Sequence, residues 1–179
     1  MNIILYTLFF LVLDSVLRKI TLKTIKFSGL DFLFFASWMA GINYGISQGV
    51  IVSFILLIWH TFLRPSKAQY IMFSLPAQIS AVALGYFFGL ENFAISLIVY
   101  QFLNFVLILI TGGFGMHFII FLALNTFFNL ILHNILLRFV WERIARRLLK
   151  IICLKEILLL DACKLANFYF KNFKSYYLN

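Results

Sequence analysis

Charged residues are scarce in this sequence. Of its 179 residues, 12% are charged and 64% are hydrophobic, whereas a soluble domain has about 25% charged and roughly 45–50% apolar residues. The mean hydropathy is +1.02. This composition excludes a soluble globular domain. Apolar stretches long enough for a bilayer core of about 30 Å occupy most of the chain up to Val140, so we expect an integral membrane protein.

The sequence also lacks the alternation of polar and apolar residues that marks an outer-membrane β-barrel. Phe, Leu and Ile instead follow one another without interruption, as in residues 118–124. The expected fold class is therefore all-α, a polytopic bundle of about six transmembrane helices plus a C-terminal amphipathic helix. We expect residues 1–140 to form the transmembrane bundle and residues 141–179 to form a basic amphipathic tail on the membrane surface.

Cysteines and catalytic groupings are equally few. Cys153 and Cys163 are the only cysteines, and their spacing matches no zinc or redox motif. The histidines are His60, His117 and His133, and three isolated histidines make no metal site. No nucleophile with a base, no clustered carboxylates and no His-rich motif appear. We therefore expect neither an enzyme nor a metal or other cofactor.

What the sequence does contain is a regular spacing of small residues. Glycines recur at every fourth position in residues 41–49, and a second series of small residues follows in residues 77–89. On helices such series form shallow grooves, which let two backbones approach closely in lipid. The predicted helix-packing residues are Gly41, Gly45, Gly49, Ala77, Ala81, Gly85 and Gly89.

Polar residues and helix-breaking residues divide the apolar stretches into segments. The stretch of residues 29–63 is too long for one span, so we expect a break within residues 41–47, although a break there would interrupt the glycine groove. Pro65 and its polar neighbours predict a loop, and Pro76 predicts a kink inside the next helix. The expected helices cover residues 3–17, 31 to the break, the break to 63, 69–88, 93–111 and 117–140.

The cations are concentrated near the C-terminus. Nine of the 15 lysines and arginines lie at or beyond Arg138, a distribution typical of a positive-inside anchor at lipid headgroups and not of nucleic-acid binding. The connectors at residues 18–26 and 64–67 are also basic, which conflicts with this orientation. Because the tail holds more cations, we expect both termini on the cytoplasmic side of the cell (inner) membrane.

Amide side chains and a histidine mark the last three predicted spans. Intramembrane polar groups are costly and are therefore candidates for function, and Asn125, Asn129 and His133 recur at a spacing that keeps them near one side of a helix. The bland alternative is that these groups only hydrogen-bond between helices, at about 0.6 kcal/mol each. The predicted substrate-binding residues are Gln78, Gln101, Asn104, Asn125, Asn129 and His133.

Two aspartates lie near predicted apolar spans before Glu91, the first glutamate of the sequence. Asp14 and Asp31 are candidates for a proton or cation site, as carboxylates in transporters are. Both lie near predicted helix ends, so the simpler expectation is that water solvates them at the membrane interface. His60 and His117 are expected to stand alone.

The order of these features resembles two kinds of six-helix membrane subunit. A short first helix, a helix leading into Gly41, Gly45 and Gly49, a loop, and a helix with Pro76 and a small-residue end at Gly85 resemble the vitamin-capturing subunits of energy-coupling-factor transporters. The layout of residues 1–145 is similar also to the bacterial rod-shape protein MreD. The first resemblance implies a ligand held by the outer loops and the outer ends of the last three helices.

That resemblance also implies the kind of ligand, because Lys23, Lys26, Arg64 and Lys67 would favour an anionic one. We expect a substrate-binding or membrane subunit of a transporter. The alternative is a non-catalytic scaffold subunit of a membrane or cell-envelope complex involved in cell shape, as the MreD resemblance implies. The expected partners are the lipid bilayer and other membrane or cytoplasmic subunits, with no nucleic acid.

Overall fold

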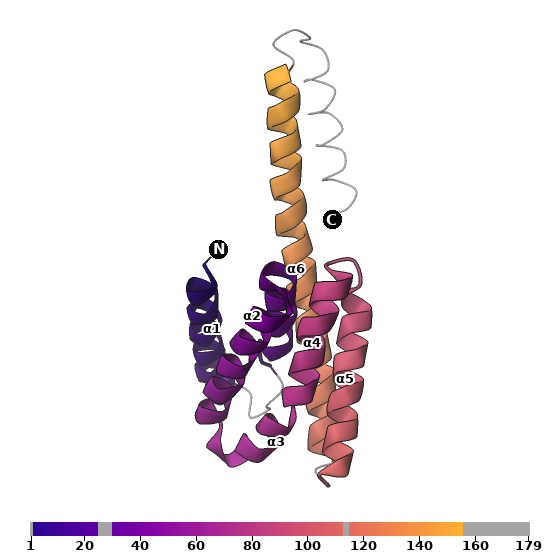
Figure 1. Cartoon of the computed structure of the whole chain (residues 1–179). Coiled ribbons are helices and arrows are strands. Elements are labelled where there is room, and N and C mark those ends of the chain that lie inside the picture. Colours follow the sequence, from indigo (N-terminus) through magenta and orange to yellow (C-terminus); the bar gives the residue numbers. More distant parts are fainter. Residues whose placement is uncertain (1, 25–29, 113–114, 156–179) are drawn as a thin grey trace. The chain divides into compact units, whose positions relative to one another are not determined.

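All regular structure in the described part of the chain is helical. The computed structural model describes residues 2–24, 30–112 and 115–155, and within these ranges it contains helices and no strand. The all-α fold class is therefore confirmed for these residues (Figure 1). The helices are α1 (Ile3–Thr24), α2 (Leu33–Leu63), the 3-10 helix η1 (Pro65–Lys67), α3 (Ala68–Phe73), α4 (Leu75–Phe88), α5 (Phe93–Ile110) and α6 (Met116–Lys155).

Three of these helices are long and apolar enough to cross a membrane: Leu33–Leu63, Phe93–Ile110 and Met116–Arg138. A bent pair, Pro65–Phe73 with Leu75–Phe88, would make a fourth span if it counts as one. The helix α1 carries several charges, among them Asp14 and Arg18, which membrane spans rarely hold. By length and composition, these helices are those of a membrane protein.

The predicted break in the long apolar stretch is confirmed at Gly45 of α2. This glycine has φ 81° and ψ 179°, a conformation that side-chain-bearing residues rarely adopt. The two arms of α2, residues 33–44 and 46–63, bring Gly49 close to Gly41, because a Cβ on Gly49 would lie 3.2 Å from the Gly41 nitrogen. A straight helix would separate these two residues by about 12 Å, so the glycine series folds back on itself.

The prediction of one continuous helix over residues 69–88 was wrong. The chain leaves the helix at Ser74, and the segments on either side are bent by 53°. Pro76 lies in the first turn of α4, where its missing N–H would have had no helical partner. Proline therefore begins a new helix here instead of kinking a continuous one.

The first arm of α2 packs closely on α4. A Cβ on Gly41 would collide with the carbonyl oxygen of Val82, and a Cβ on Gly85 would collide with the carbonyl oxygen of Trp38. Ala77 and Ala81 of α4 are fully buried. We call this the glycine contact, defined by Trp38, Gly41, Val82 and Gly85. Two members of the predicted series do not belong to this contact. Gly45 forms the break in α2, and Gly89 caps the end of α4 with φ 62°, where an added Cβ would meet no described atom within 4 Å.

The helix α1 has one polar side and one apolar side. On the inner side the Tyr6 hydroxyl donates to the carbonyl oxygen of Ala36 at 2.6 Å, and the indole N–H of Trp59 donates to the Ser15 hydroxyl oxygen at 3.0 Å. The outer side is exposed and apolar at Ile4, Leu5, Leu8, Phe9, Val12 and Val16. That surface has the character of one that faces lipid acyl chains.

The backbone of α6 is continuous from Met116 to Lys155, so the helix expected to end at Val140 does not end there. The chain divides into two compact units, residues 1–133 and 134–179. For the predicted amphipathic tail, the structure describes only the helical backbone as far as Lys155. Residues 156–179, with the predicted aromatic end, lie outside the described residues.

Candidate functional site

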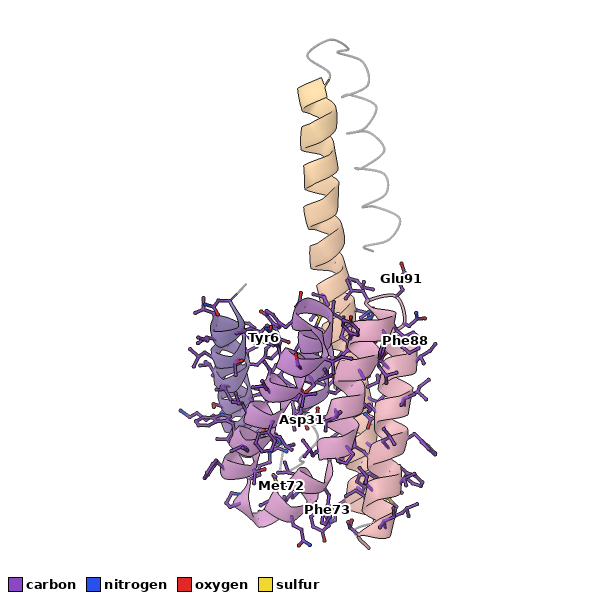
Figure 2. The ribbon with its side chains drawn as sticks, viewed as in Figure 1. Tyr6, Asp31, Met72, Phe73, Phe88 and Glu91 are labelled. Carbon is purple, nitrogen blue, oxygen red and sulfur yellow. The ribbon has the colours of Figure 1, made fainter. Side chains whose placement is uncertain are left out.

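Several polar side chains are buried within the first unit. Figure 2 shows Asp31 between the end of the bundle that carries Tyr6, Phe88 and Glu91 and the end that carries Met72 and Phe73. The Asp31 side chain is 2% exposed. The other buried polar residues are Thr7, Asp14, Thr21, Ser37, Ser53, His60, Gln78, Ser96, Gln101, Asn104, Asn125 and Asn129.

Four of these residues form one hydrogen-bonded group, which we call the amide cluster: Asp31, Gln101, Asn125 and Asn129. Asn125 Nδ2 donates to Asp31 Oδ1 at 3.2 Å. Asn125 Oδ1 accepts from Gln101 Nε2 at 2.9 Å and from Asn129 Nδ2 at 3.0 Å. Residues just before α2, on α5 and on α6 thus meet at the Asn125 side chain. Gln101 Nε2 also donates to the hydroxyl oxygen of Thr126 at 3.0 Å.

Two oxygens of the amide cluster, Gln101 Oε1 and Asn129 Oδ1, are buried and accept no hydrogen bond from any residue that the structure describes. Gln101 is 7% exposed and Asn129 is fully buried. A buried acceptor without a donor costs about 1–3 kcal/mol. A group that served only to join helices would be expected to satisfy such atoms.

The remaining predicted amides belong to a separate group. Gln78 Oε1 accepts from the Ser37 hydroxyl at 2.9 Å, and Gln78 Nε2 donates to the Tyr100 hydroxyl oxygen at 2.8 Å. Asn104 Nδ2 donates to the backbone carbonyl of Tyr100 at 3.1 Å. Gln78 of α4 therefore connects α2 and α5, whereas the Asn104 bond lies within α5, and neither residue is a member of the amide cluster.

His133 lies apart from both groups. Its ring stacks on Phe93 with centroids 4.0 Å apart and an interplanar angle of 7°, and it meets the Trp38 ring edge-on at 6.1 Å. Its Nε2 and the Trp38 Nε1 are buried and have no hydrogen-bond partner among residues 2–24, 30–112 and 115–155. The even spacing of Asn125, Asn129 and His133 therefore brings the two asparagines together but not the histidine.

The expectation that water solvates Asp14 and Asp31 was wrong, because both are buried. Asp14 Oδ2 lies 2.8 Å from His60 Nδ1, and the two side chains are 8% and 3% exposed. His60, expected to stand alone, thus forms a buried pair between α1 and α2. No local pattern links these two residues, since 46 positions separate them in the sequence.

Asp31 lies in a charged environment at the start of α2. The Leu33 N–H donates to its Oδ1 at 3.2 Å, a contact favoured by the unpaired N–H groups at a helix N-terminus. His60, Arg64 and Asp14 act on its charge electrostatically. The Arg64 guanidinium itself donates to the Leu30 carbonyl oxygen at 3.3 Å.

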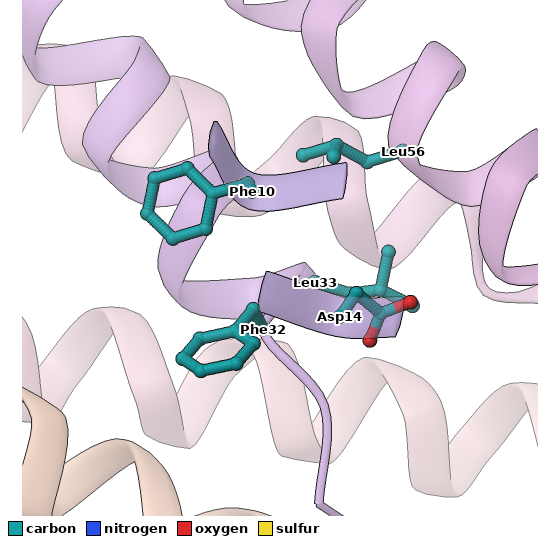
Figure 3. Close-up of a pocket in the computed structure, with 5 residues that line it drawn as sticks. All are labelled: Phe10, Asp14, Phe32, Leu33 and Leu56. Carbon is teal, nitrogen blue, oxygen red and sulfur yellow. The ribbon is translucent and has the colours of Figure 1, made fainter. Parts of the chain in front are cut away.

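A small pocket opens beside Asp14. It is lined by Phe10, Asp14, Phe32, Leu33 and Leu56 (Figure 3). Its volume of about 10 Å³ is close to what one water molecule requires. This pocket is therefore far too small for a vitamin-sized ligand.

The basic residues predicted to attract an anion are only partly described. Arg64 directly precedes η1 and Lys67 is its last residue. The Lys23 side chain and Lys26 lie outside the described residues. In the part of the chain that the structure describes, no group of three or more His, Cys, Asp or Glu side chains could hold a metal ion.

The amide cluster combines a buried carboxylate with two buried carbonyl oxygens that accept no hydrogen bond from the described part of the chain. Comparison with known proteins adds no relative, because no protein-family model, no curated protein and no solved structure matches the chain.

Proposed function

We propose that this chain is a membrane subunit of a transporter and that the amide cluster is its substrate-binding site. The observation that carries the proposal is the meeting of Asp31, Gln101, Asn125 and Asn129 at mid-height of an apolar bundle. Ionisable and polar groups at this depth are costly, and they commonly mark the path of a substrate or ion.

The energetics favour binding over helix joining. Interhelical hydrogen bonds in membranes contribute about 0.6 kcal/mol each, while a partly satisfied buried network is less stable than an apolar core. Gln101 Oε1 and Asn129 Oδ1 are unpartnered, so the amide cluster is of the partly satisfied kind. A bound substrate that donates to these oxygens would remove the cost.

For the topology we propose six membrane segments: α1, the two arms of α2, the bent pair of α3 and α4, α5, and the first part of α6. The first arm of α2 covers residues 33–44, a length of about 18 Å. It would enter a bilayer core of about 30 Å without crossing all of it. Asp31, at its start, would then lie within the membrane. We place the chain in the cell membrane with its C-terminus in the cytoplasm.

Native mass spectrometry of the protein released from its own membrane tests this function. We expect a stoichiometric small-molecule adduct on the wild-type protein and its loss from the variant Asn129→Leu. The matched control is Asn43→Leu, because Asn43 is an exposed amide on α2 and its loss should leave the adduct in place. An adduct that survives Asn129→Leu would remove the amide cluster as the site.

The second candidate is a scaffold subunit of a membrane or envelope complex, in the manner of MreD. The glycine contact favours it, because backbones packed closely at Gly41 and Gly85 make a rigid support, and the pocket beside Asp14 holds only about one water. Deletion of residues 141–179 should then release the protein partners in the same spectra. An intact complex after the deletion would contradict a tail-mediated scaffold.

A further inference from the structure

The helix α1 and the second arm of α2 face each other in register. Asp14 Oδ2 lies 2.8 Å from His60 Nδ1, and 46 positions separate the two residues in the sequence. The same offset relates Phe10 to Leu56, which line the small pocket together with Asp14 (Figure 3). Side chains four positions apart lie on one face of a helix. The pocket therefore adjoins the buried pair, one helical turn nearer the start of α1.

The layer on the other side of the pair is cationic. Arg18 and Arg64 each follow a member of the pair by four positions, and their charges act on one another. Arg18 Nη1 is buried and meets no acceptor in the part of the chain that the structure describes. Arginine charges in a confined polar path repel protons and other cations. A positively charged species would therefore reach the pair from the pocket and not from the arginines.

The pocket suits a proton carrier and no larger cation. Its volume of about 10 Å³ is close to what one water molecule requires. Asp14 supplies its polar wall, and a metal cation would need several oxygen ligands. A single water beside a carboxylate can pass on a proton. The remaining lining side chains are apolar: Phe10, Phe32, Leu33 and Leu56.

One proton changes the net charge of the pair. With Asp14 ionised and His60 neutral, the pair carries one negative charge, and an added proton cancels this charge whichever residue holds it. Burial favours the uncharged, proton-bound pair. The positive charge of Arg18, which acts on Asp14, favours the negative pair. Such opposing influences allow a buried pair to bind a proton and also to release it.

The segment just before α2 connects the pair with the amide cluster. The Leu33 side chain lines the pocket beside Asp14, while the Leu33 N–H donates to Asp31 Oδ1 at 3.2 Å. The charges of Asp14 and His60 also act on Asp31. Release of the proton from the pair therefore raises the electrostatic energy of the Asp31 carboxylate, which is a member of the amide cluster.

We propose that Asp14 and His60 bind one exchangeable proton, which reaches them through the water-sized pocket and serves as the coupling ion of transport. This role rests on the proposed transporter function, with the amide cluster as the substrate site. From α6, the described neighbour of Asp31 is the neutral amide of Asn125. The other charged or titratable groups around the pair, directly or through a neighbour, are Arg18 of α1, Asp31 before α2, Arg64 at the end of α2, Lys67 of η1 and Tyr100 of α5.

NMR of the full chain in lipid vesicles, with isotope-labelled histidine and aspartate, tests proton binding without any variant. The signals of the pair are identified by the correlation between His60 Nδ1 and the Asp14 carboxyl group, 2.8 Å apart. We expect them to change from the proton-bound to the proton-free form between pH 5 and 8, the range in which histidine ordinarily changes its charge. We also expect the proton to exchange with water. Signals that are the same at both pH values, or a proton that does not exchange, would overturn the site.

Native mass spectrometry at the same two pH values tests the coupling. Retention of the small-molecule adduct by the wild-type protein should differ about tenfold between pH 5 and pH 8, which corresponds to a coupling of about 1.4 kcal/mol. Asp14→Asn keeps an oxygen that can accept from His60 and should remove this difference. His117→Gln, at an exposed histidine, should preserve it. Equal retention by the wild-type protein at both pH values would contradict the coupling.

The two measurements separate this inference from the substrate-binding proposal. Proton binding by the pair without any small-molecule adduct would leave the proton site standing and remove the amide cluster as a substrate site. An adduct that is lost from Asn129→Leu, together with NMR signals of the pair that do not change with pH, would leave the substrate site standing and remove the proton site.

Discussion

The glycine contact and the amide cluster are two regions of the same unit, and they are built differently. At the glycine contact, backbone lies against backbone, and a single added methyl group on Gly41 or Gly85 would meet a carbonyl oxygen. In the amide cluster, side chains from distant parts of the chain meet through directed hydrogen bonds and leave acceptors unused. Close packing leaves no choice of arrangement, whereas an incompletely bonded network can take up a ligand or proton. The comparison predicts that substitutions at the glycine contact mainly lower the free energy of unfolding, and that substitutions in the amide cluster mainly change ligand binding.

The largest expected effect concerns the buried pair of Asp14 and His60, which belongs to neither region. His60→Leu leaves the Asp14 carboxylate buried without the partner that lies 2.8 Å away. Removal of one member of a buried pair costs about 3–5 kcal/mol. We expect a loss of that size in the free energy of unfolding, measured in mixed micelles. His117→Leu, at an exposed histidine, is the control. An equal effect of both changes would mean that the pair contributes nothing specific.

The next effect tests the glycine contact directly. Gly41→Ala places a methyl group against the Val82 carbonyl oxygen, and the helices must separate to accommodate it. Overpacking of this kind costs about 1–3 kcal/mol. Gly115→Ala is the matched control, because a Cβ there meets nothing within 4 Å. The same unfolding measurement should separate the two variants, and a neutral Gly41→Ala would contradict the comparison.

The smallest effect concerns an ordinary interhelical hydrogen bond. Ser37→Ala removes the donor to Gln78 Oε1, a bond of 2.9 Å in the core. Bonds of this type contribute about 0.6 kcal/mol in membranes, so a double-mutant cycle of Ser37→Ala with Gln78→Leu, measured as the free energy of unfolding, should give a coupling of about that amount. Ser66→Ala, at an exposed serine in η1, should change nothing. A coupling as large as the loss caused by Gly41→Ala would mean that hydrogen bonds between helices, and not close packing, dominate the stability of the bundle.

Local patterns in the sequence were sufficient to predict several features of the structure. The composition alone predicts apolar helices, and the length of the apolar stretch of residues 29–63 predicts a break within residues 41–47, which the structure has at Gly45. The spacing of Asn125 and Asn129 predicts that they share a helix face, and they hydrogen-bond to each other. These properties depend on residues within a few turns of one another, which is the range over which helical periodicity operates.

Other features depend on contacts between residues far apart in the chain. Neither the pairing of Asp14 with His60 nor the meeting of Asp31 with Asn125 has a local signal, because 46 and 94 positions separate the partners. The break at Ser74 was equally hidden, since Pro76 is compatible with both a kink and a new helix. The amino-acid sequence by itself determined a membrane protein made of helices and the places where several of them end. Only the tertiary structure decided which polar groups are buried together, because burial and hydrogen-bond partners depend on how helices pack and not on any one helix.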